Sequence, residues 1–372
     1  MAEKIIIETS KKTQLNITSV YDWSGKNKKP IIISGPCSAE NESQVLATAH
    51  AIANIDPSII FRAGIWKPRT RPNSFEGVGI EGLGWLQKVK EETGMKITTE
   101  VANAKHVEEC LKHGIDILWI GARTTVSPFA VQEIADVLKG VDIPVMIKNP
   151  VNPDLQLWIG AIERIQQAGI NKIVAIHRGF HTFSKSPFRN DPNWQIAVEL
   201  KLMFPALPMI CDPSHICGST ELIPYIAQKA LDMELDGLMI ETHILPEIAK
   251  SDPKQQLTPS QLEELLSKLV VREPISQSKK FIDSLTELRS NINKIDDEIL
   301  HLLMTRMQIA KEIGKYKKKN NVTILQAARW EELLKDRISR GQMMGLNEDT
   351  VKKIYHIIHE EAVRIQTEIM NS

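Results

Sequence analysis

Eight short apolar runs, separated by segments of helical periodicity, fill the chain between residues 30 and 270. Within each run the apolar residues are consecutive and do not alternate with polar ones. Such strands are buried on both faces, as in a parallel sheet. The runs occupy residues 31–34, 59–62, 96–100, 117–121, 143–148, 172–177, 207–211 and 237–241. The helical segments occupy residues 41–54, 81–93, 104–113, 128–139, 154–168, 192–204, 219–232 and 259–270.

Eight strand–helix units in about 240 residues predict an α/β fold of the (β/α)8 TIM-barrel type. A doubly wound open sheet shows the same alternation. That fold usually carries a Gly-x-Gly-x-x-Gly turn after its first strand, and no such turn follows residues 31–34. We therefore predict a barrel over residues 30–270. The preceding residues 1–29 are a polar extension that either covers the bottom of a domain or forms a partly ordered tail.

Every predicted strand has an ionisable side chain at or just after its carboxyl end, which is where barrel enzymes build their active sites. One such charge is usually structural, but a charge at all eight ends indicates a site. In strand order these residues are Cys37, Arg62, Glu100, Arg123, Lys148, His177 with Arg178, His215 and Glu241, and Lys67, Arg69 and Thr70 follow the second strand.

A divalent metal site is predicted from four of the residues near these strand ends. Cys37, His215 and Glu241 follow three different strands, and Asp252 comes eleven residues after Glu241. Thiolate, imidazole and carboxylate groups together accept several divalent ions, so the sequence does not specify which metal binds.

Six cations are predicted to converge on the same mouth, which indicates polyanionic ligands. The chain has no phosphate-binding nucleotide loop, so phosphorylated and carboxylated small molecules are favoured over a nucleotide. Beside them, a metal would polarise the carbonyl of a small sugar phosphate. The six cations are Arg62, Lys67, Arg69, Arg123, Lys148 and Arg178.

The overall charge and the cysteines exclude several classes of protein. Lys and Arg together number 46 and so do Asp and Glu, so no global charge indicates nucleic acid or membrane binding. Four cysteines in 372 residues argue against a disulfide scaffold and for a reducing compartment. The first ten residues do not resemble a signal peptide, and no run approaches the length of a membrane span. We therefore expect a cytoplasmic protein.

The motifs at the strand ends resemble those of 3-deoxy-D-arabino-heptulosonate 7-phosphate (DAHP) synthase, in the branch that is similar to 3-deoxy-octulosonate 8-phosphate synthase. The resemblance covers roughly residues 30–270. It rests on Gly35-Pro36-Cys37-Ser38, on Arg62 with Lys67-Pro68-Arg69-Thr70, on Gly121-Ala122-Arg123, on Lys148 and Arg178, and on Asp212-Pro213-Ser214-His215.

The resemblance implies the condensation of phosphoenolpyruvate with erythrose 4-phosphate, the first step of the shikimate pathway of aromatic amino acid biosynthesis. It also implies roles for the residues. Cys37, His215, Glu241 and Asp252 would bind the metal, and Arg123 and Arg178 would bind the phosphate of phosphoenolpyruvate. Lys67 and Lys148 would lie near its carboxylate, Arg62 would lie between the substrates, and Arg69 and Thr70 would bind erythrose 4-phosphate. Glu100 and Lys67 are the candidates for proton transfer, a step that the sequence does not assign to either. An octulosonate-type synthase is disfavoured, because those enzymes lack the Lys-Pro-Arg-Thr motif.

A second, all-helical domain is predicted after a Pro- and Ser-containing linker at residues 271–280. One helix is expected from Phe281 to about Lys319, about 57 Å long, followed by two shorter helices at about 325–340 and 347–370. A domain of residues 281–372 cannot cover so long a helix by itself. We therefore expect a second copy to cover its apolar stripe, in an intertwined homodimer.

Cations lie near the apolar stripe of the predicted helices, which favours a site for a compact dianion. Arg306 and Lys317, for example, are eleven residues apart, close to three helical turns. Without such a site, the domain would be a dimerisation module whose charges are solvated. The other polar residues considered for this site are Arg289, Arg329 and Gln366.

Over about residues 281–370 the chain resembles the all-helical chorismate mutase, which rearranges chorismate to prephenate without a cofactor. The motifs are Leu288-Arg289, Asp296-Asp297, Arg306, Ile313-Gly314-Lys315-Tyr316-Lys317 and Arg329. The resemblance implies that Arg289 reaches into the partner's site, that Arg306 and Arg329 bind carboxylates, and that Lys317 and Gln366 contact the ether oxygen. The sequence departs from the family pattern at Gln326, Trp330 and Ala362, where an acid, a Glu and a Ser are common.

Together these features predict a bifunctional enzyme, a transferase joined to an isomerase, with prephenate as a feedback inhibitor of the barrel. Alternatively, the helical domain is mainly a regulatory, ligand-binding dimerisation module.

Overall fold

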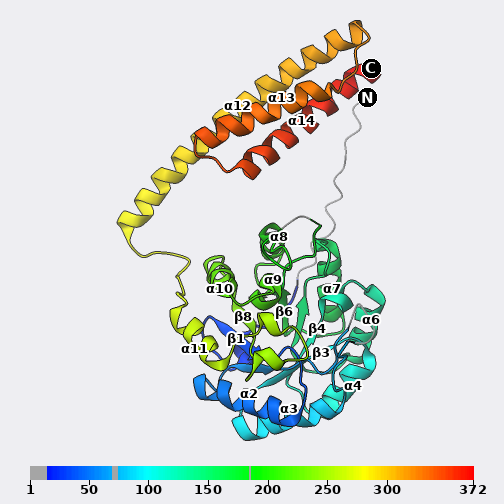
Figure 1. Cartoon of the computed structure of the whole chain (residues 1–372), viewed down its shortest axis with the longest axis vertical. Helices are drawn as coiled ribbons and strands as arrows, with labels where there is room; N and C mark the ends of the chain where they lie inside the picture. The colour runs from blue at the N-terminus through cyan, green and yellow to red at the C-terminus, as the bar shows by residue number, and fades with distance from the viewer. Residues whose placement is uncertain (1–14, 69–73, 184–185) are drawn as a thin grey trace. The chain divides into compact units, whose positions relative to one another are not determined.

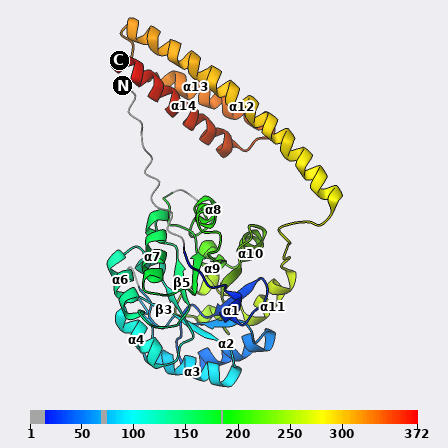
Figure 2. The ribbon, with the colours of Figure 1, turned by 180° about the vertical axis from the view of Figure 1, so that it is seen from behind.

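The computed structural model describes residues 15–68, 74–183 and 186–372. The chain divides into two compact units, one ending at Pro274 and the other spanning Ile275–Ser372 (Figures 1 and 2). The strands of the described chain all belong to the first unit, and the second unit is helical.

Eight parallel strands form a closed barrel in sequence order, which confirms the predicted fold and excludes the doubly wound sheet. Pairing of β1 with β8 closes the barrel and sets Gly35 beside Glu241. The strands are β1 (Ile31–Gly35), β2 (Ile60–Arg62), β3 (Ile97–Val101), β4 (Ile117–Ile120), β5 (Val145–Lys148), β6 (Ile173–His177), β7 (Met209–Cys211) and β8 (Gly237–Glu241).

The strands are buried on both faces, and this explains why their sequences do not alternate. Neighbouring side chains of a strand point to opposite faces of the sheet. Ile31 and Ile33 of β1 belong to a cluster inside the barrel, which also contains Trp119. Ile32, between them, belongs to the larger cluster outside the strands, where the helices pack. Both faces of the strands therefore need apolar residues.

The segment before β1 covers the amino ends of the strands. Val20 is buried in the inner cluster, and Tyr21 and Trp23, in the short helix α1 (Tyr21–Ser24), pack against it. The backbone N–H of Thr18 donates to the carbonyl of Asn171, just before β6. The described part of the extension thus closes the end of the barrel opposite to the strand ends that carry the predicted site.

Eight longer helices surround the strands, and several begin at side-chain N-caps that hold their first free N–H groups. The caps are Asn41, Asn103, Ser127, Asp154 and Thr258. The helices are α2 (Glu42–Ile55), α3 (Glu81–Thr93), α4 (Ala104–Lys112), α6 (Pro128–Val137), α7 (Leu155–Gln167), α8 (Trp194–Met203), α10 (Ile223–Asp232) and α11 (Pro259–Lys268). Short helical turns at the site are α5 (Ala122–Thr125), α9 (Pro213–Cys217), η1 (Pro246–Ile248) and η2 (Pro253–Gln255).

The second unit consists of three helices, as predicted: α12 (Lys279–Lys319), α13 (Ala327–Met343) and α14 (Glu348–Asn371). The helix α12 has 41 residues; α14 packs along its carboxyl-terminal part, and α13 packs against α14 (Figure 1). Gly314 is buried where α12 meets α14, and a Cβ there would lie 3.0 Å from the Ile369 side chain. Most apolar residues in the first two thirds of α12 are exposed within this single chain. They include Leu288, Ile292, Ile295, Ile299 and Leu302.

Among the described residues, no helix combines the length and the apolar character that a membrane crossing requires.

Candidate functional site

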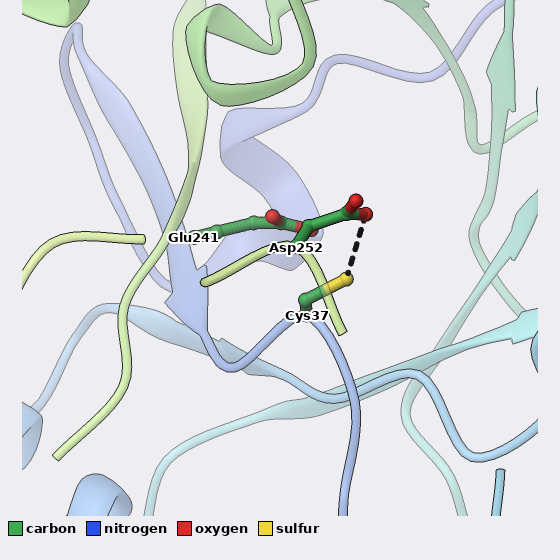
Figure 3. Close-up of side chains that lie close together, drawn as sticks. All are labelled: Cys37, Glu241 and Asp252. Carbon is green, nitrogen blue, oxygen red and sulfur yellow. Dashed lines mark hydrogen bonds between the residues drawn. The ribbon is translucent and has the colours of Figure 1, made fainter. Parts of the chain in front are cut away.

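Three of the four predicted metal ligands meet at the carboxyl end of the barrel. Cys37 follows β1, Glu241 ends β8, and Asp252 precedes η2 in the loop after β8. One ligand atom from each lies within 4.8 Å of the others. Figure 3 shows the three side chains pointing toward one another, with the Cys37 thiol 3.5 Å from Asp252 Oδ2.

The fourth predicted ligand, His215, lies beside this group but is not a member of it. It is in the one-turn helix α9, and its Nε2 is 3.8 Å from Glu241 Oε1. Its Nδ1 is 3.0 Å from Asp212 Oδ1. Burial lowers the pKa of His215 below its usual value, although Asp212 acts in the opposite direction. A neutral ring that donates its Nδ1–H to Asp212 leaves the Nε2 lone pair directed at the group, as in many metal-binding histidines.

The chemistry of this group fits a divalent cation. Glu241 Oε1 is buried and accepts no hydrogen bond from the described residues, although it forms an ion pair of 3.2 Å with Arg62 Nη2. Burial, with Glu241 next in effect, raises the pKa of the Cys37 thiol to about 12. A bound cation would displace this proton and supply the missing partner of Glu241. The donors are sulfur, nitrogen and oxygen, a mixed set that accepts several divalent metals.

A loop that the sequence analysis did not single out holds the carboxylates in place. Arg189 Nη1 lies 2.9 Å from Asp252 Oδ1 and 2.7 Å from Gln255 Oε1. Gln255 in turn donates to Glu241 Oε2 over 2.7 Å. Burial alone would raise the pKa of Asp252, but Arg189 and other cations lower it to about 2. One arginine is thereby linked to both carboxylates of the group.

Most of the predicted cations converge on one small cavity of about 70 Å³ next to the metal-ligand group. Within it, Lys67 donates to the Cys37 carbonyl over 2.9 Å and to its sulfur over 3.3 Å. The cavity is lined by Lys67, Pro68, Glu100, Ala122, Arg123, Lys148, Arg178, Arg189, His215 and Asp252. Arg62 is not in the lining, but it is fully buried directly beside the cavity, where it pairs with Glu241.

The buried cations are each oriented by a polar neighbour. Lys148 Nζ lies 2.8 Å from Asp212 Oδ2. Burial lowers the pKa of Lys148, although Asp212 opposes this effect. Arg178 donates to Asn190 Oδ1 over 2.8 Å, and Asn190 donates to the carbonyl of His215 over 2.6 Å. Burial lowers the pKa of Arg178 to about 10, so the guanidinium remains charged at neutral pH.

Two of the predicted substrate-binding residues, Arg69 and Thr70, lie outside the described residues. Arg123 is in the described chain, in the short helix α5, and its side chain is exposed at the edge of the cavity. Glu100 accepts a hydrogen bond of 3.1 Å from Trp119 Nε1.

A second candidate site lies between the three helices of the other unit, as a cavity of about 320 Å³. Four of its predicted residues, Arg306, Lys317, Arg329 and Gln366, line it. The fifth, Arg289, is exposed on α12 and does not reach this cavity in the single chain. The full lining is Arg306, Ile309, Ala310, Ile313, Lys317, Ile324, Gln326, Arg329, Trp330, Leu333, His359, Ala362, Val363 and Gln366.

The helical cavity contains no acidic residue among its described lining, so its charge is positive. Lys317 Nζ donates to the carbonyl of Ile324 over 2.5 Å, and the one hydrogen bond of Arg306 within the described chain is a long one of 3.5 Å to the carbonyl of Ile358. These neutral acceptors leave both cations uncompensated, which suits a dianionic ligand.

The departures from the mutase pattern change one wall of this cavity. Trp330 stacks on His359, with ring centroids 3.9 Å apart and an angle of 14° between the planes. Ala362 is buried beside this pair and offers no hydroxyl. The wall therefore has an aromatic surface where an acid and a hydroxyl were expected, while the cations are retained.

Comparison with known families gives two matches that together cover most of the chain. Residues 7–276 match the model of the DAHP synthetase I family, and residues 288–367 match that of chorismate mutase type II.

Curated relatives of the barrel include two kinds of aldolase. The chain is 31% identical over 238 residues to phospho-2-dehydro-3-deoxyheptonate aldolase of Thermotoga maritima, covering 64% of this chain and 68% of the relative. It is 29% identical over 272 residues to 2-dehydro-3-deoxyphosphooctonate aldolase of Helicobacter pylori, covering 66% of this chain and 96% of the relative.

Solved structures show the same similarity in three dimensions. The crystal structure of phospho-2-dehydro-3-deoxyheptonate aldolase (DAHP synthase) from Thermotoga maritima has a TM-score of 0.59 at 29% identity, over 70% of both chains. A truncated form of 3-deoxy-D-arabino-heptulosonate 7-phosphate synthase from the same organism has a TM-score of 0.56 at 27% identity, over 70% of this chain and 88% of that one.

Proposed function

Because the chain belongs to the DAHP synthetase I family and carries a chorismate mutase type II domain, we propose that it joins the two corresponding reactions. The barrel condenses phosphoenolpyruvate with erythrose 4-phosphate to DAHP and phosphate. The helical domain rearranges chorismate to prephenate. The observation that carries the first assignment is the convergence of the metal-ligand group and the cations on one cavity.

In the barrel, the cations position two anionic substrates. Arg178, with Arg123 at the rim, binds the phosphate of phosphoenolpyruvate, and Lys148 and Lys67 lie near its carboxylate. Arg62 lies between the two substrates. Held in this way, carbon 3 of phosphoenolpyruvate attacks the aldehyde carbon, water adds at carbon 2, and phosphate leaves. Fixed positions reduce the entropic barrier, and the cations stabilise the developing negative charge.

The proposed metal ligands are Cys37, His215, Glu241 and Asp252. A divalent metal bound there would polarise the aldehyde oxygen of the sugar phosphate. The donor set is compatible with ions of the Mn, Fe, Co or Zn type. Glu100, which lines the same cavity, and Lys67 are the candidates for proton transfer.

Erythrose 4-phosphate is favoured over arabinose 5-phosphate as the second substrate of the barrel. The proposal rests on the motif Lys67-Pro68-Arg69-Thr70, in which Arg69 and Thr70 bind the shorter sugar phosphate. A coupled assay that measures phosphate release with each sugar tests it. Turnover with erythrose 4-phosphate and none with arabinose 5-phosphate is expected, and the reverse preference would make the barrel an octulosonate-type synthase.

In the helical domain, Arg306 and Arg329 bind the two carboxylates of chorismate, and Lys317 and Gln366 contact the ether oxygen whose bond breaks. No covalent intermediate or cofactor is required, because the catalysis consists of positioning and charge stabilisation. The aromatic wall formed by Trp330 and His359 replaces the polar contacts to the ligand hydroxyl. The uncompensated charge of Arg306 and Lys317 is what supports this assignment.

A second copy of the chain completes the helical site in this proposal. The amino-terminal part of α12 exposes a row of large apolar residues, and Leu302, for example, is 67% exposed in the single chain. Burying this row against another α12 places Arg289 in the partner's site. The proposed assembly is therefore a homodimer or a higher homo-oligomer through the helical domain. Size-exclusion chromatography with light scattering tests it, and a monomer at micromolar concentration would contradict it.

The proposed regulation is inhibition of the barrel by prephenate bound in the helical domain. It is motivated by the fusion itself, since two sites on one chain can be coupled through their ligands. Synthase activity that is unchanged under saturating prephenate would contradict it. A mainly regulatory helical domain is the alternative, and binding of chorismate without its conversion would favour that reading.

The division of the chain into an extension (1–29), a barrel (30–270), a linker (271–280) and a helical domain (281–372) is retained as part of the proposal. So is a cytoplasmic location, which suits the four free cysteines and the small metabolites of a biosynthetic enzyme. Nucleic acid and membrane partners are not expected.

A further inference from the structure

Trp119 lies inside the barrel, directly beneath the cationic cavity, although its apolar strand makes it look like an ordinary core residue. It is fully buried in β4, in the inner cluster formed by side chains that point into the barrel. On β3 its neighbour in register is Glu100. The indole is therefore surrounded by the strand ends that carry the proposed catalytic residues.

The indole contacts three of these residues at once. Its Nε1–H donates to Glu100 Oε2 over 3.1 Å. The guanidinium carbon of Arg62 lies 4.9 Å from the centre of the ring, and Lys148 Nζ lies 5.9 Å from it. Both distances are within the range of a cation–π contact. One side chain thus touches residues from β2, β3 and β5.

The cation–π contact affects Arg62 and Lys148 differently from a hydrogen bond. An aromatic face attracts a buried cation without using its N–H groups as a hydrogen-bond acceptor would. Consistent with this, Nε and Nη1 of Arg62 have no hydrogen-bond partner among the described residues. The ring lowers the cost of burying these charges and does not occupy their N–H donors.

Glu100 is fixed by the same side chain from another direction. Gly121 follows β4, and a Cβ at that position would lie 2.0 Å from Glu100 Oε1. The carboxyl group therefore occupies the space over Gly121 while the indole N–H holds its second oxygen. Its position at the cavity depends on both the absence of a side chain at residue 121 and the presence of the indole at residue 119.

We propose that Trp119 is a positioning residue of the barrel reaction, whose ring face holds Arg62 and Lys148 and whose N–H holds Glu100. The inference rests on the proposed function of the barrel. The two parts of the indole then have separate effects on the kinetics. The ring face acts on the binding of phosphoenolpyruvate, and the N–H acts on the turnover step.

The test uses two substitutions in the full-length, metal-loaded protein. Trp119→Phe keeps an aromatic face and removes the N–H, so kcat should fall about tenfold while KM for phosphoenolpyruvate stays within about threefold. Trp119→Leu removes both, so KM should rise about tenfold in addition. A residue that only fills space would lower stability without separating KM from kcat in this way.

Trp158→Phe is the matched control. Trp158 is equally buried, and its Nε1 donates to the carbonyl of Ile147 over 3.1 Å, but it belongs to the outer cluster. The control should leave both kinetic constants close to those of the wild type. Kinetic constants of both Trp119 variants within about twofold of the wild type, or the same changes in Trp158→Phe, would overturn the inference.

Two further results keep the test decisive. If Trp119→Leu does not fold, Trp119→Phe decides alone: a lower kcat at unchanged KM supports the inference, and a wild-type kcat contradicts it. If the wild type forms no DAHP, the proposed function fails by itself. The role of the ring is then tested by calorimetry with phosphoenolpyruvate, where Trp119→Phe should bind like the wild type and Trp119→Leu about tenfold more weakly. Equal binding by all three proteins would contradict it.

Discussion

The two candidate sites carry similar charges but are built in different ways. In the barrel, Arg62, Lys148 and Arg178 are at most 7% exposed, and each is oriented by Glu241, Asp212 or Asn190. The helical cavity is more open, and Arg329, one of its cations, is exposed. The only ion pair of Arg329 among the described residues is with Glu332, on the next turn of the same helix.

This difference shows how much of each site one chain supplies. Eight parallel strands bring their carboxyl ends together, so a closed barrel collects distant residues into one preorganised site. Three helices with a long exposed apolar face leave their site open, and Arg289 does not reach it. In our account one chain supplies the described residues of the barrel site, whereas the helical site is completed by assembly.

The largest effect is expected from Cys37→Ala. Loss of a metal ligand should lower DAHP formation by about a thousandfold, because Lewis-acid stabilisation contributes several kcal/mol. Metal content after dialysis should fall with activity. Cys110→Ala is the control, since Cys110 is also buried but belongs to the outer cluster. Retention of both metal and activity in Cys37→Ala would remove the proposed metal site.

Arg306→Ala should impair the helical site and leave the barrel site active, the reverse of the effect of Cys37→Ala. Chorismate turnover should fall by about a hundredfold, the effect of removing one electrostatic contact to the reacting ligand. DAHP formation should stay within about twofold of the wild type. Arg340→Ala is the control, because Arg340 is exposed and pairs with Asp336 away from the cavity. Equal chorismate turnover in both variants would argue against a ligand site at Arg306.

The barrel should also be the more acid-sensitive unit, because of His177. Burial lowers the pKa of this fully buried ring to about 3. In the unfolded chain its pKa is about 6.5, so unfolding takes up a proton between these values and stability falls as the pH drops below about 6.5. Between pH 6.5 and 5 this one group should cost about 2 kcal/mol.

Urea unfolding followed by tryptophan fluorescence at pH 7, 6 and 5 measures this loss. In His177→Asn the side chain cannot take up the proton, so the variant should lose less stability over the same range. An identical pH dependence in the variant and the wild type would exclude His177 as the cause.

A smaller effect is expected from Asn190→Ala, which removes the hydrogen-bond acceptor of Arg178. Hydrogen bonds to charged groups contribute enough that KM for phosphoenolpyruvate should rise about tenfold. Asn152→Ala, an exposed position in the β5–α7 loop, is the control and should leave KM unchanged. If both variants behave alike, the position of Arg178 does not depend on Asn190.

The fold could be predicted from the sequence because strands that are buried on both faces consist of consecutive apolar residues. Most of the candidate site could be predicted as well, since the carboxyl ends of parallel strands lie at one end of the barrel whatever the conformation of the loops. Cys37, Glu241 and Lys148, for example, were identified from their positions after strands, and the structure brings all three to the same end of the barrel.

The residues that sequence reasoning missed lie in loops or look like core. Arg189, in a loop, and Gln255, in the short turn η2, orient the carboxylates from segments that have no periodic signal. The only available hint was that polar residues cluster after β6 and next to Asp252. Nothing in the sequence hinted at a role for Trp119 in the site, because an aromatic residue in an apolar strand usually indicates packing. Arg289 was named from the sequence, but it does not line the helical cavity in the single chain, so its proposed role stays a prediction that a dimer would test.

The most direct test of the account is chorismate consumption by the full-length Cys37→Ala protein, measured together with its DAHP formation. We predict that the variant consumes chorismate at the wild-type rate while it forms almost no DAHP. This result would establish two separate catalytic sites on one chain. Absence of chorismate turnover in both the wild type and the variant would contradict the account, leaving the barrel as the enzyme and the helical domain as a binding module.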